Sequence, residues 1–347
     1  MKSANPQFGL VLTGGGALGA YQVGALQYLA EIDFAPHIIA GSSIGALNSA
    51  MLATYRPLSH AIQRLDELWA KLSEVRPLRF NALTGSRYAA RFFAPVLAPG
   101  LDAFYELCLD FMSSWEILPD SGSLLDITPI EQHIRLLINP DELRKGTELW
   151  ITAFPCVNFF GIELDTSIEM IRARMGGETH WLCVNDFPND EDIWTLLLAS
   201  SALPWIFPRR KAAGVTYMDG GLTDNVPLKP LAERGCKYVI VIHLQNGSLW
   251  DRDKFPDQTI IEIRPQQRMK KSDKPILGMV ETLFDFSAER IMTLKERGYE
   301  DARSCMEPIL ETLKIVNSQN KGINSLINST NSLLSSTQQL LDDEPLV

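Results

Sequence analysis

The chain has 347 residues, of which 46% are hydrophobic and 21% are charged, and its formal net charge is -10. This composition is typical of a globular protein with one large domain or two smaller ones. The acidic balance argues against a nucleic acid polymer as the main partner and against strong nonspecific attraction to anionic membranes.

Cysteine usage and hydropathy bear on location. The five cysteines are scattered without a C-x-x-C pair, which favours reduced thiols and a cytoplasmic protein. Residues 8–12 are too short an apolar run for a signal peptide, and no stretch approaches 18 consecutive apolar residues. We therefore expect no transmembrane helix.

Short apolar runs alternate with helical patterns from the N-terminus onward. Residues 8–13 predict a buried strand, residues 17–31 a helix, and residues 37–40 a second strand that leads into an alanine-rich helix. The segment from residue 59 to about 111 is mainly helical, and further strands are predicted at 149–154, 238–244 and 260–264. This alternation predicts an α/β fold with a central, mainly parallel sheet flanked by helices.

Glycines are concentrated at the start of the first predicted helix, in T-G-G-G-A-L-G-A-Y-Q-V-G-A-L from Thr13 to Leu26. Bare backbone at a helix N-terminus is typical of an anion site. The G-x-G-x-x-G spacing also fits a dinucleotide site, but residues 34–40 lack the carboxylate that such a site needs, and no Gly-Lys-Ser/Thr phosphate loop is present. We interpret the loop as a candidate oxyanion hole, formed by Gly14, Gly15, Gly16 and Gly19.

The second strand is followed by Gly41-Ser42-Ser43-Ile44-Gly45. This stretch fits G-x-S-x-G, the nucleophile elbow, in which a tight turn between a strand and a helix exposes a serine hydroxyl. The spacing makes Ser43 the candidate nucleophile, which requires a base and donors for the developing negative charge.

Two residues compete for the role of base. Asp219 lies in Y-M-D-G-G, where the two glycines indicate either a close backbone approach or a plain Asp-Gly hairpin turn. His243 follows Asp219 in the order that a serine–histidine–acid enzyme requires, but it ends a predicted strand, where a structural histidine is the simpler interpretation.

The combination G-G-G-A-L-G, G-S-S-I-G, L-A-S-S-A-L-P-W-I-F-P and D-G-G, in this order over roughly residues 8–302, resembles the patatin-like phospholipase family. N-V-P at 225–227 and S-L-L-D-I-T-P at 123–129 also resemble family segments. The resemblance implies a three-layer patatin-like fold and a metal-independent serine–aspartate dyad that hydrolyses acyl esters of glycerolipids, with Ser43 as nucleophile and Asp219 as base. No cofactor or metal is implied. Leu18 departs from the family, which often has Arg or Lys at this position.

Three segments are candidates for contact with lipid. Aromatic residues between Arg79 and Trp115 line an acyl groove, form a mobile cap or belong to ordinary core. Residues 205–211 (W-I-F-P-R-R-K) place aromatics beside cations, which suits either docking to phospholipid or a wall of the site. A second basic cluster, Arg268, Lys270 and Lys271, is interpreted as a solvated loop.

The composition changes to Asn, Ser, Thr and Leu after Pro308. We therefore predict an acyl hydrolase domain at 1–307 and a helical tail at 308–347. Apolar residues in the tail follow alternating steps of four and three, a heptad pattern with polar interruptions. The tail either associates with itself or a partner helix, or is loosely ordered.

The leading hypothesis is a cytoplasmic, transiently membrane-associated phospholipase A or lysophospholipase, acting constitutively or as an effector that a signal, such as a cyclic nucleotide, switches on. Two rivals stay open. One is a weakly catalytic patatin-like scaffold that works through its tail, and the other is a hydrolase of soluble esters that uses Asp219 and His243.

Overall fold

The structure is a computed structural model that describes residues 7–74, 128–159, 162–163, 169, 172–173, 176–201, 209–245, 250–269, 282–283 and 285–342. The chain divides into two compact units, Met1–Ala302 and Arg303–Val347.

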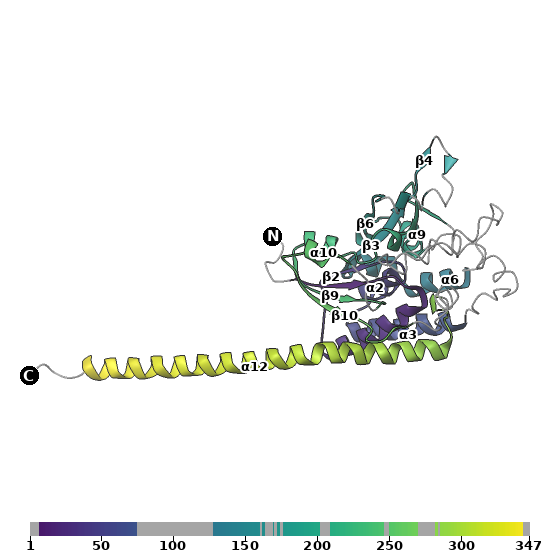
Figure 1. Cartoon of the computed structure of the whole chain (residues 1–347). Helices are drawn as coiled ribbons and strands as arrows, with labels where there is room; N and C mark the ends of the chain where they lie inside the picture. The colour runs from purple at the N-terminus through teal and green to yellow at the C-terminus, as the bar shows by residue number, and fades with distance from the viewer. Residues whose placement is uncertain are drawn as a thin grey trace, which may run out of the picture. The chain divides into compact units, whose positions relative to one another are not determined.

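The first unit is built on an eight-stranded sheet (Figure 1). The strand order is β10-β9-β1-β2-β3-β8-β7, and β6 also pairs with β3. The strands are β1 Gln7–Leu12, β2 Ile38–Gly41, β3 Glu148–Pro155, β6 His180–Cys183, β7 Arg210–Ala212, β8 Val215–Asp219, β9 Cys236–Ile242 and β10 Thr259–Ile263. A separate pair is formed by β4 Asn158–Phe159 and β5 Ile162–Glu163.

Pairing is parallel from β10 to β3 and antiparallel for β6, β7 and β8. The predicted α/β fold with a central sheet flanked by helices is therefore confirmed. The antiparallel strands β6, β7 and β8 were not predicted, and β6 and β7 are too short to show a periodic pattern.

The helices of this unit are α1 Gly19–Glu31, α2 Ile44–Thr54, α3 Leu58–Glu74, α6 Thr128–Leu137, α7 Pro140–Lys145, α9 Asp190–Ser200 and α10 Lys229–Glu233. Short 3-10 turns are η1 Gly16–Leu18, η2 Val184–Asp186, η3 Gly220–Leu222 and η4 Arg252–Lys254. Leu18, the departure from the family pattern, is buried within η1.

Both faces of the sheet are covered. Leu231 of α10 packs with Val11, Ala40 and Val241 in one apolar cluster. Successive side chains of a strand point to opposite faces, so the buried Leu12 and its neighbours on alternate positions face the other side. The helices α1 and α2 lie side by side, since Asn48 of α2 donates to Gln22 of α1. Burial on both faces explains why the central strands read as unbroken apolar runs.

The last helix, α12 (Ala288–Asp342), spans both units and continues through Pro308. Its first turns approach α1 closely, since a Cβ at Gly24 would lie 1.8 Å from the carbonyl oxygen of Lys295. Tyr299 extends this contact, and its hydroxyl donates to Glu31 at 2.8 Å. Among the described helices, none combines the length and the apolar composition that a bilayer crossing requires.

Several expectations concern residues outside the described ranges. These are the aromatic run between Arg79 and Trp115, residues 205–208 of the aromatic and basic stretch, and Lys270 with Lys271. Of the described cations, Arg210 forms an ion pair with Glu131 at 2.7 Å.

Candidate active site

The serine elbow connects β2 to α2. The backbone of Ser43 has φ 52° and ψ -128°, and α2 begins at the next residue. This left-handed conformation is costly for a residue with a side chain and is typical of a nucleophile held outward by its surroundings. Gly45 is required because a Cβ there would lie 2.2 Å from the carbonyl oxygen of Leu12 in the neighbouring strand.

The register of β3 brings the elbow to the end of β8. Gly41 lies opposite Ile151, and Asp219 lies opposite Ala153, two residues further along β3. Because β6 pairs with both Ile151 and Ala153, β2 and β8 must share the other edge of β3. Ser43, two residues beyond Gly41, is therefore level with Asp219.

The side chains of Ser43 and Asp219 are in direct contact. Ser43 Oγ donates to Asp219 Oδ2 at 2.7 Å, and the Gly221 N–H donates to Asp219 Oδ1 at 2.8 Å. Both side chains are buried. Burial raises the pKa of Asp219 to about 7, and the two hydrogen bonds oppose this shift. The site therefore brings together a hydroxyl and a carboxyl that is poised to accept a proton near neutral pH.

The C-terminal end of α9 holds the elbow from the other side. The Ser43 N–H donates to Ser200 Oγ at 3.3 Å, and Ser201 Oγ donates to the Ser43 carbonyl oxygen at 3.0 Å. The neighbouring Ser42 accepts a hydrogen bond from Thr152 of β3 at 2.9 Å. These bonds satisfy polar groups around a strained residue and so help to keep its conformation.

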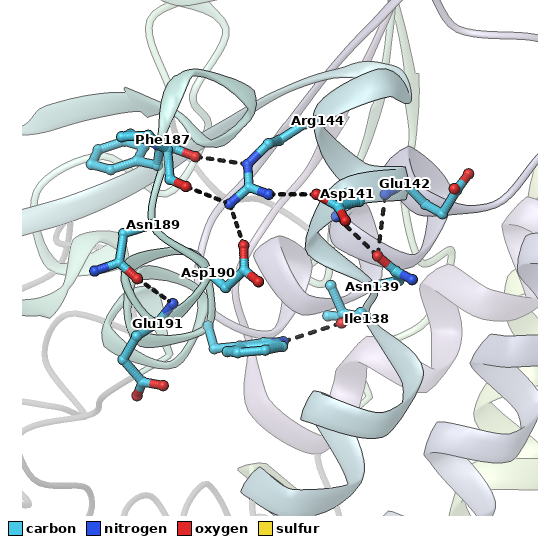
Figure 2. A network of polar contacts seen from close by, with 11 residues as sticks. Ile138, Asn139, Asp141, Glu142, Arg144, Phe187, Asn189, Asp190 and Glu191 are labelled. Carbon is cyan, nitrogen blue, oxygen red and sulfur yellow. Dashed lines mark hydrogen bonds and ion pairs between the residues drawn. The ribbon is translucent and has the colours of Figure 1, made fainter.

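An arginine fixes the start of α9 relative to α7 (Figure 2). Arg144 donates through Nε to the Phe187 carbonyl oxygen at 3.0 Å and through a terminal nitrogen to Asp141 at 2.9 Å, and it also pairs with Asp190. Asn189 caps α9 by accepting from the Glu191 N–H at 2.9 Å. These contacts fix the start of α9, the helix whose C-terminal end contacts Ser43.

The four glycines expected in the oxyanion hole differ in what their amides do. The Gly14 N–H donates to Asn225 Oδ1 at 2.8 Å, and the Gly19 N–H donates to carbonyl oxygens of the η1 turn. The amides of Gly15 and Gly16 donate to no other described residue. Of the four glycines, Gly15 and Gly16 are therefore the two whose N–H groups, within the described part of the chain, are left to offer to a ligand.

A buried chain of hydrogen bonds supports the glycine loop from behind. Gln22 of α1 donates to the Thr13 carbonyl oxygen at 2.7 Å, and Asn48 of α2 donates to Gln22 at 2.9 Å. Asn48 accepts in turn from the indole of Trp69 at 3.0 Å. Since all three side chains are fully buried, the chain holds the loop between the two helices at one position.

His243 lies elsewhere. It follows β9, which is separated from β8 by three strands, and its Nε2 lies 2.8 Å from Glu262 Oε2 of β10. Burial lowers the pKa of His243, although the contact with Glu262 opposes this effect. The structure thus places Asp219, and not His243, in contact with Ser43.

Sequence reasoning assigned no role to Asn225, Ser200, Ser201 or Thr152. A signal for three of them was present, because they lie in N-V-P and L-A-S-S-A-L-P, segments that resemble the family. Thr152 lies inside an apolar strand and carried no signal. Among the described residues, no cluster of three or more His, Cys, Asp or Glu side chains could hold a metal ion.

Comparisons with known proteins identify the family to which the chain belongs. A family model described as patatin-like phospholipase matches residues 10–232. The human patatin-like phospholipase domain-containing protein 6 is 24% identical over 250 residues, which are 72% of this chain and 14% of that protein. Lysophospholipase NTE1 of Cryptococcus neoformans is 26% identical over 252 residues, covering 71% of this chain and 11% of that protein. The chain therefore spans a small part of the length of these relatives.

Among solved structures, the crystal structure of VipD from Legionella pneumophila aligns with 88% of this chain and 68% of its own, at 15% identity and a TM-score of 0.45.

Proposed function

This chain belongs to the patatin-like phospholipase family, and we propose that it hydrolyses fatty-acyl esters of membrane glycerophospholipids with a Ser43–Asp219 dyad. The observation that carries the proposal is the 2.7 Å hydrogen bond from Ser43 Oγ to Asp219 Oδ2. It lies beside a glycine loop in which two amides have no partner among the described residues.

In the first half of the reaction, Ser43 Oγ attacks the ester carbonyl carbon while its proton moves to Asp219 Oδ2. The N–H groups of Gly15 and Gly16 stabilise the negative charge on the carbonyl oxygen. The tetrahedral intermediate then collapses, the bond to the alcohol breaks, and Asp219 returns the proton to the departing oxygen. A lysolipid or glycerol derivative leaves, and the acyl group stays on Ser43.

In the second half, Asp219 accepts a proton from a water molecule that attacks the acyl carbon. Collapse of the second intermediate releases the fatty acid, and the proton returns to Ser43. Each half begins and ends with the same protonation state of the dyad, so no metal or redox partner is needed for the balance.

The surroundings of the dyad favour this proton transfer. Ser43 is the residue immediately before α2, where the helix macrodipole stabilises negative charge on its oxygen. The buried carboxyl of Asp219, with its pKa raised to about 7, is a stronger base than an ordinary aspartate and is still largely ionised just above neutral pH.

The ester bonds of phospholipids lie at the membrane interface, so the chain would act there as a peripheral protein, reached from the cytoplasm. The Asp219–His243 alternative is not favoured, because the His243 imidazole contacts Glu262 at 2.8 Å, on the opposite side of β1 from the dyad.

The proposal is tested by measuring fatty acid release from phosphatidylcholine vesicles and hydrolysis of a short-chain soluble ester. We expect Ser43→Ala and Asp219→Ala each to lower kcat on vesicles by about a hundredfold to ten-thousandfold. We expect His243→Ala to retain activity. Ser49→Ala is a matched control, since Ser49 lies buried in α2, the helix that follows Ser43, and its hydroxyl makes no hydrogen bond within the described residues.

Retained activity in Asp219→Ala together with loss in His243→Ala would transfer the base to the histidine. Hydrolysis of the soluble ester alone, with no release from vesicles, would contradict the phospholipid assignment.

A further inference from the structure

The second unit exposes a row of apolar side chains along α12. Leu313, Val316, Ile323, Leu326 and Ile327 are 44–69% exposed, although each is large and apolar. The same segment is rich in Asn and Ser and contains Gly322, residues that weaken an isolated helix. A long helix of this composition derives most of its stability from packing, so its apolar row requires a partner.

The row repeats with a period of seven. Residues 316–343 divide into four successive heptads, V-N-S-Q-N-K-G, I-N-S-L-I-N-S, T-N-S-L-L-S-S and T-Q-Q-L-L-D-D. The same pattern continues back to residue 309. The a positions are Leu313, Asn320, Ile327, Leu334 and Leu341. The d positions are Ile309, Val316, Ile323, Thr330 and Thr337. A strict repeat of seven over more than four heptads indicates a left-handed coiled coil.

We propose that residues 309–341 form a parallel, in-register coiled coil with other copies of this chain. The polar seam positions carry the argument for a second copy. In a parallel arrangement each residue of the seam faces its own equivalent, so Asn320 meets Asn320 and both threonines meet threonines. An antiparallel register that pairs Asn320 with Thr330 instead leaves Thr337 opposite Leu313. A single asparagine at an a position is the best-attested device for setting register.

The distribution of charge along the tail also favours another copy of this chain as the partner. The only charged residues between 309 and 341 are Glu311, Lys314 and Lys321, at the b and f positions of the heptad, away from the seam. Copies of the tail therefore do not repel one another, and no charge pattern selects a different chain. With two lysines and one glutamate, this segment also carries far less positive charge than is typical of helices that lie on an anionic membrane.

The residue types at the seam favour an assembly of more than two chains. Every d position carries a β-branched residue, and three of the five a positions carry leucine. This combination shifts parallel coiled coils toward trimers and tetramers. Leucines at 326, 333 and 340 occupy successive g positions and widen the apolar stripe.

The test is the mass of the full-length protein in solution, measured by sedimentation equilibrium at micromolar concentration. We expect a multiple of the single-chain mass for the wild type. Ile327→Asp should reduce it to the mass of one chain, because it places a charge in the seam. Ser325→Asp, a matched control that adds the same charge at an outward f position two residues away, should keep the assembly.

A single-chain mass for the wild type would overturn the proposal. So would co-flotation of a monomeric wild type with phosphatidylcholine vesicles that Ile327→Asp abolishes, since the apolar row would then belong to the lipid surface.

Orientation is tested with a short thiol-specific cross-linker. Asn320→Cys should give covalently linked chains on a denaturing gel, whereas Ser318→Cys at an f position and the wild type with its native cysteines should not. Absence of the linked product in an assembled Asn320→Cys protein would contradict the parallel register.

Discussion

Two carboxyl groups of the first unit, the fully buried Asp219 and the partly buried Glu262, differ in their surroundings. Asp219, at the end of β8, contacts Ser43, and Glu262, in β10, contacts His243. Burial raises the pKa of Asp219 to about 7, whereas hydrogen bonding, first of all to His243, lowers the pKa of Glu262 to about 2. One carboxyl can therefore accept a proton near neutral pH, and the other stays ionised.

The cause of the difference is the deeper burial of Asp219, together with the donors around each carboxyl. Asp219 accepts from a hydroxyl and a backbone amide, neither of which carries a charge. Glu262 also accepts from the Trp250 indole at 3.0 Å and pairs with Arg264. Electrostatic surroundings, and not residue type or chain order, decide which acid can serve as a base.

The largest effect is expected when Asp219 loses its ability to accept a proton. Asp219→Asn keeps the shape of the side chain but removes its ability to take a proton, so we expect kcat on phospholipid vesicles to fall by about a hundredfold to ten-thousandfold. The same variant should be more stable than the wild type above pH 7, because it no longer buries a charge.

The direction of this change in stability with pH follows from proton linkage. The pKa of Asp219 is raised from an ordinary value of 3.8 to about 7 in the folded chain, so this group destabilises the fold progressively as pH rises from about 4 to about 7. The difference in Tm between Asp219→Asn and the wild type should therefore grow between about pH 4 and about pH 7 and level off above it. A constant difference across that range would contradict the raised pKa.

A second prediction concerns the glycine loop, which Asn225→Ala should loosen without changing the residues of the dyad. Asn225→Ala removes the acceptor of the Gly14 amide, so the neighbouring amides of Gly15 and Gly16 lose their fixed position. We expect kcat to fall by about tenfold to a hundredfold, with a smaller change in KM. Asn139→Ala is the control, because Asn139 also accepts from a backbone amide, at 2.9 Å from Asp141, but caps α7 at the exposed surface.

The pH dependence of the rate sharpens the comparison. Asp219 must be ionised to accept the Ser43 proton, so kcat/KM on a soluble ester should rise about tenfold per pH unit below about pH 7 and level off above it. His243→Gln should leave the inflection unchanged. An inflection that moves or disappears in this variant would show that the imidazole takes part.

The smallest effect on activity is expected for His243→Gln itself. Glutamine cannot reproduce both the imidazole contact with Glu262 and its packing, so the free energy of unfolding should fall by about 1–3 kcal/mol. The rate on vesicles should change by no more than a few-fold. Urea unfolding and the vesicle assay, made on the same preparation, separate the two outcomes.

Local patterns in the sequence were sufficient to predict the parallel central strands, the elbow and the glycine loop. The central strands are buried on both faces and therefore appear as unbroken apolar runs, as in β1 and β9. The G-x-S-x-G turn and the glycine cluster are backbone geometries in which neighbouring residues impose the constraint. The heptad period of the tail is visible in the same way.

Other features could not be predicted from the sequence, because they arise from pairing between distant segments. The partner of Gly14 is 211 positions away. The turn η3 follows Asp219, where the tripeptide taken alone predicts an Asp-Gly hairpin. The short strands β6 and β7 form because β3 and β8 offer edges to them, and their own residues show no period.

The chain order of serine, aspartate and histidine left the base undecided between Asp219 and His243. Only the sheet decided it. The register along β3 sets Asp219 level with Ser43, 176 positions apart in the chain, while the strand order holds His243 on the far side of β1. Sequence determines which groups can react, because that is a property of single residues. Their meeting depends on hydrogen bonds between strands, which form only in the folded sheet.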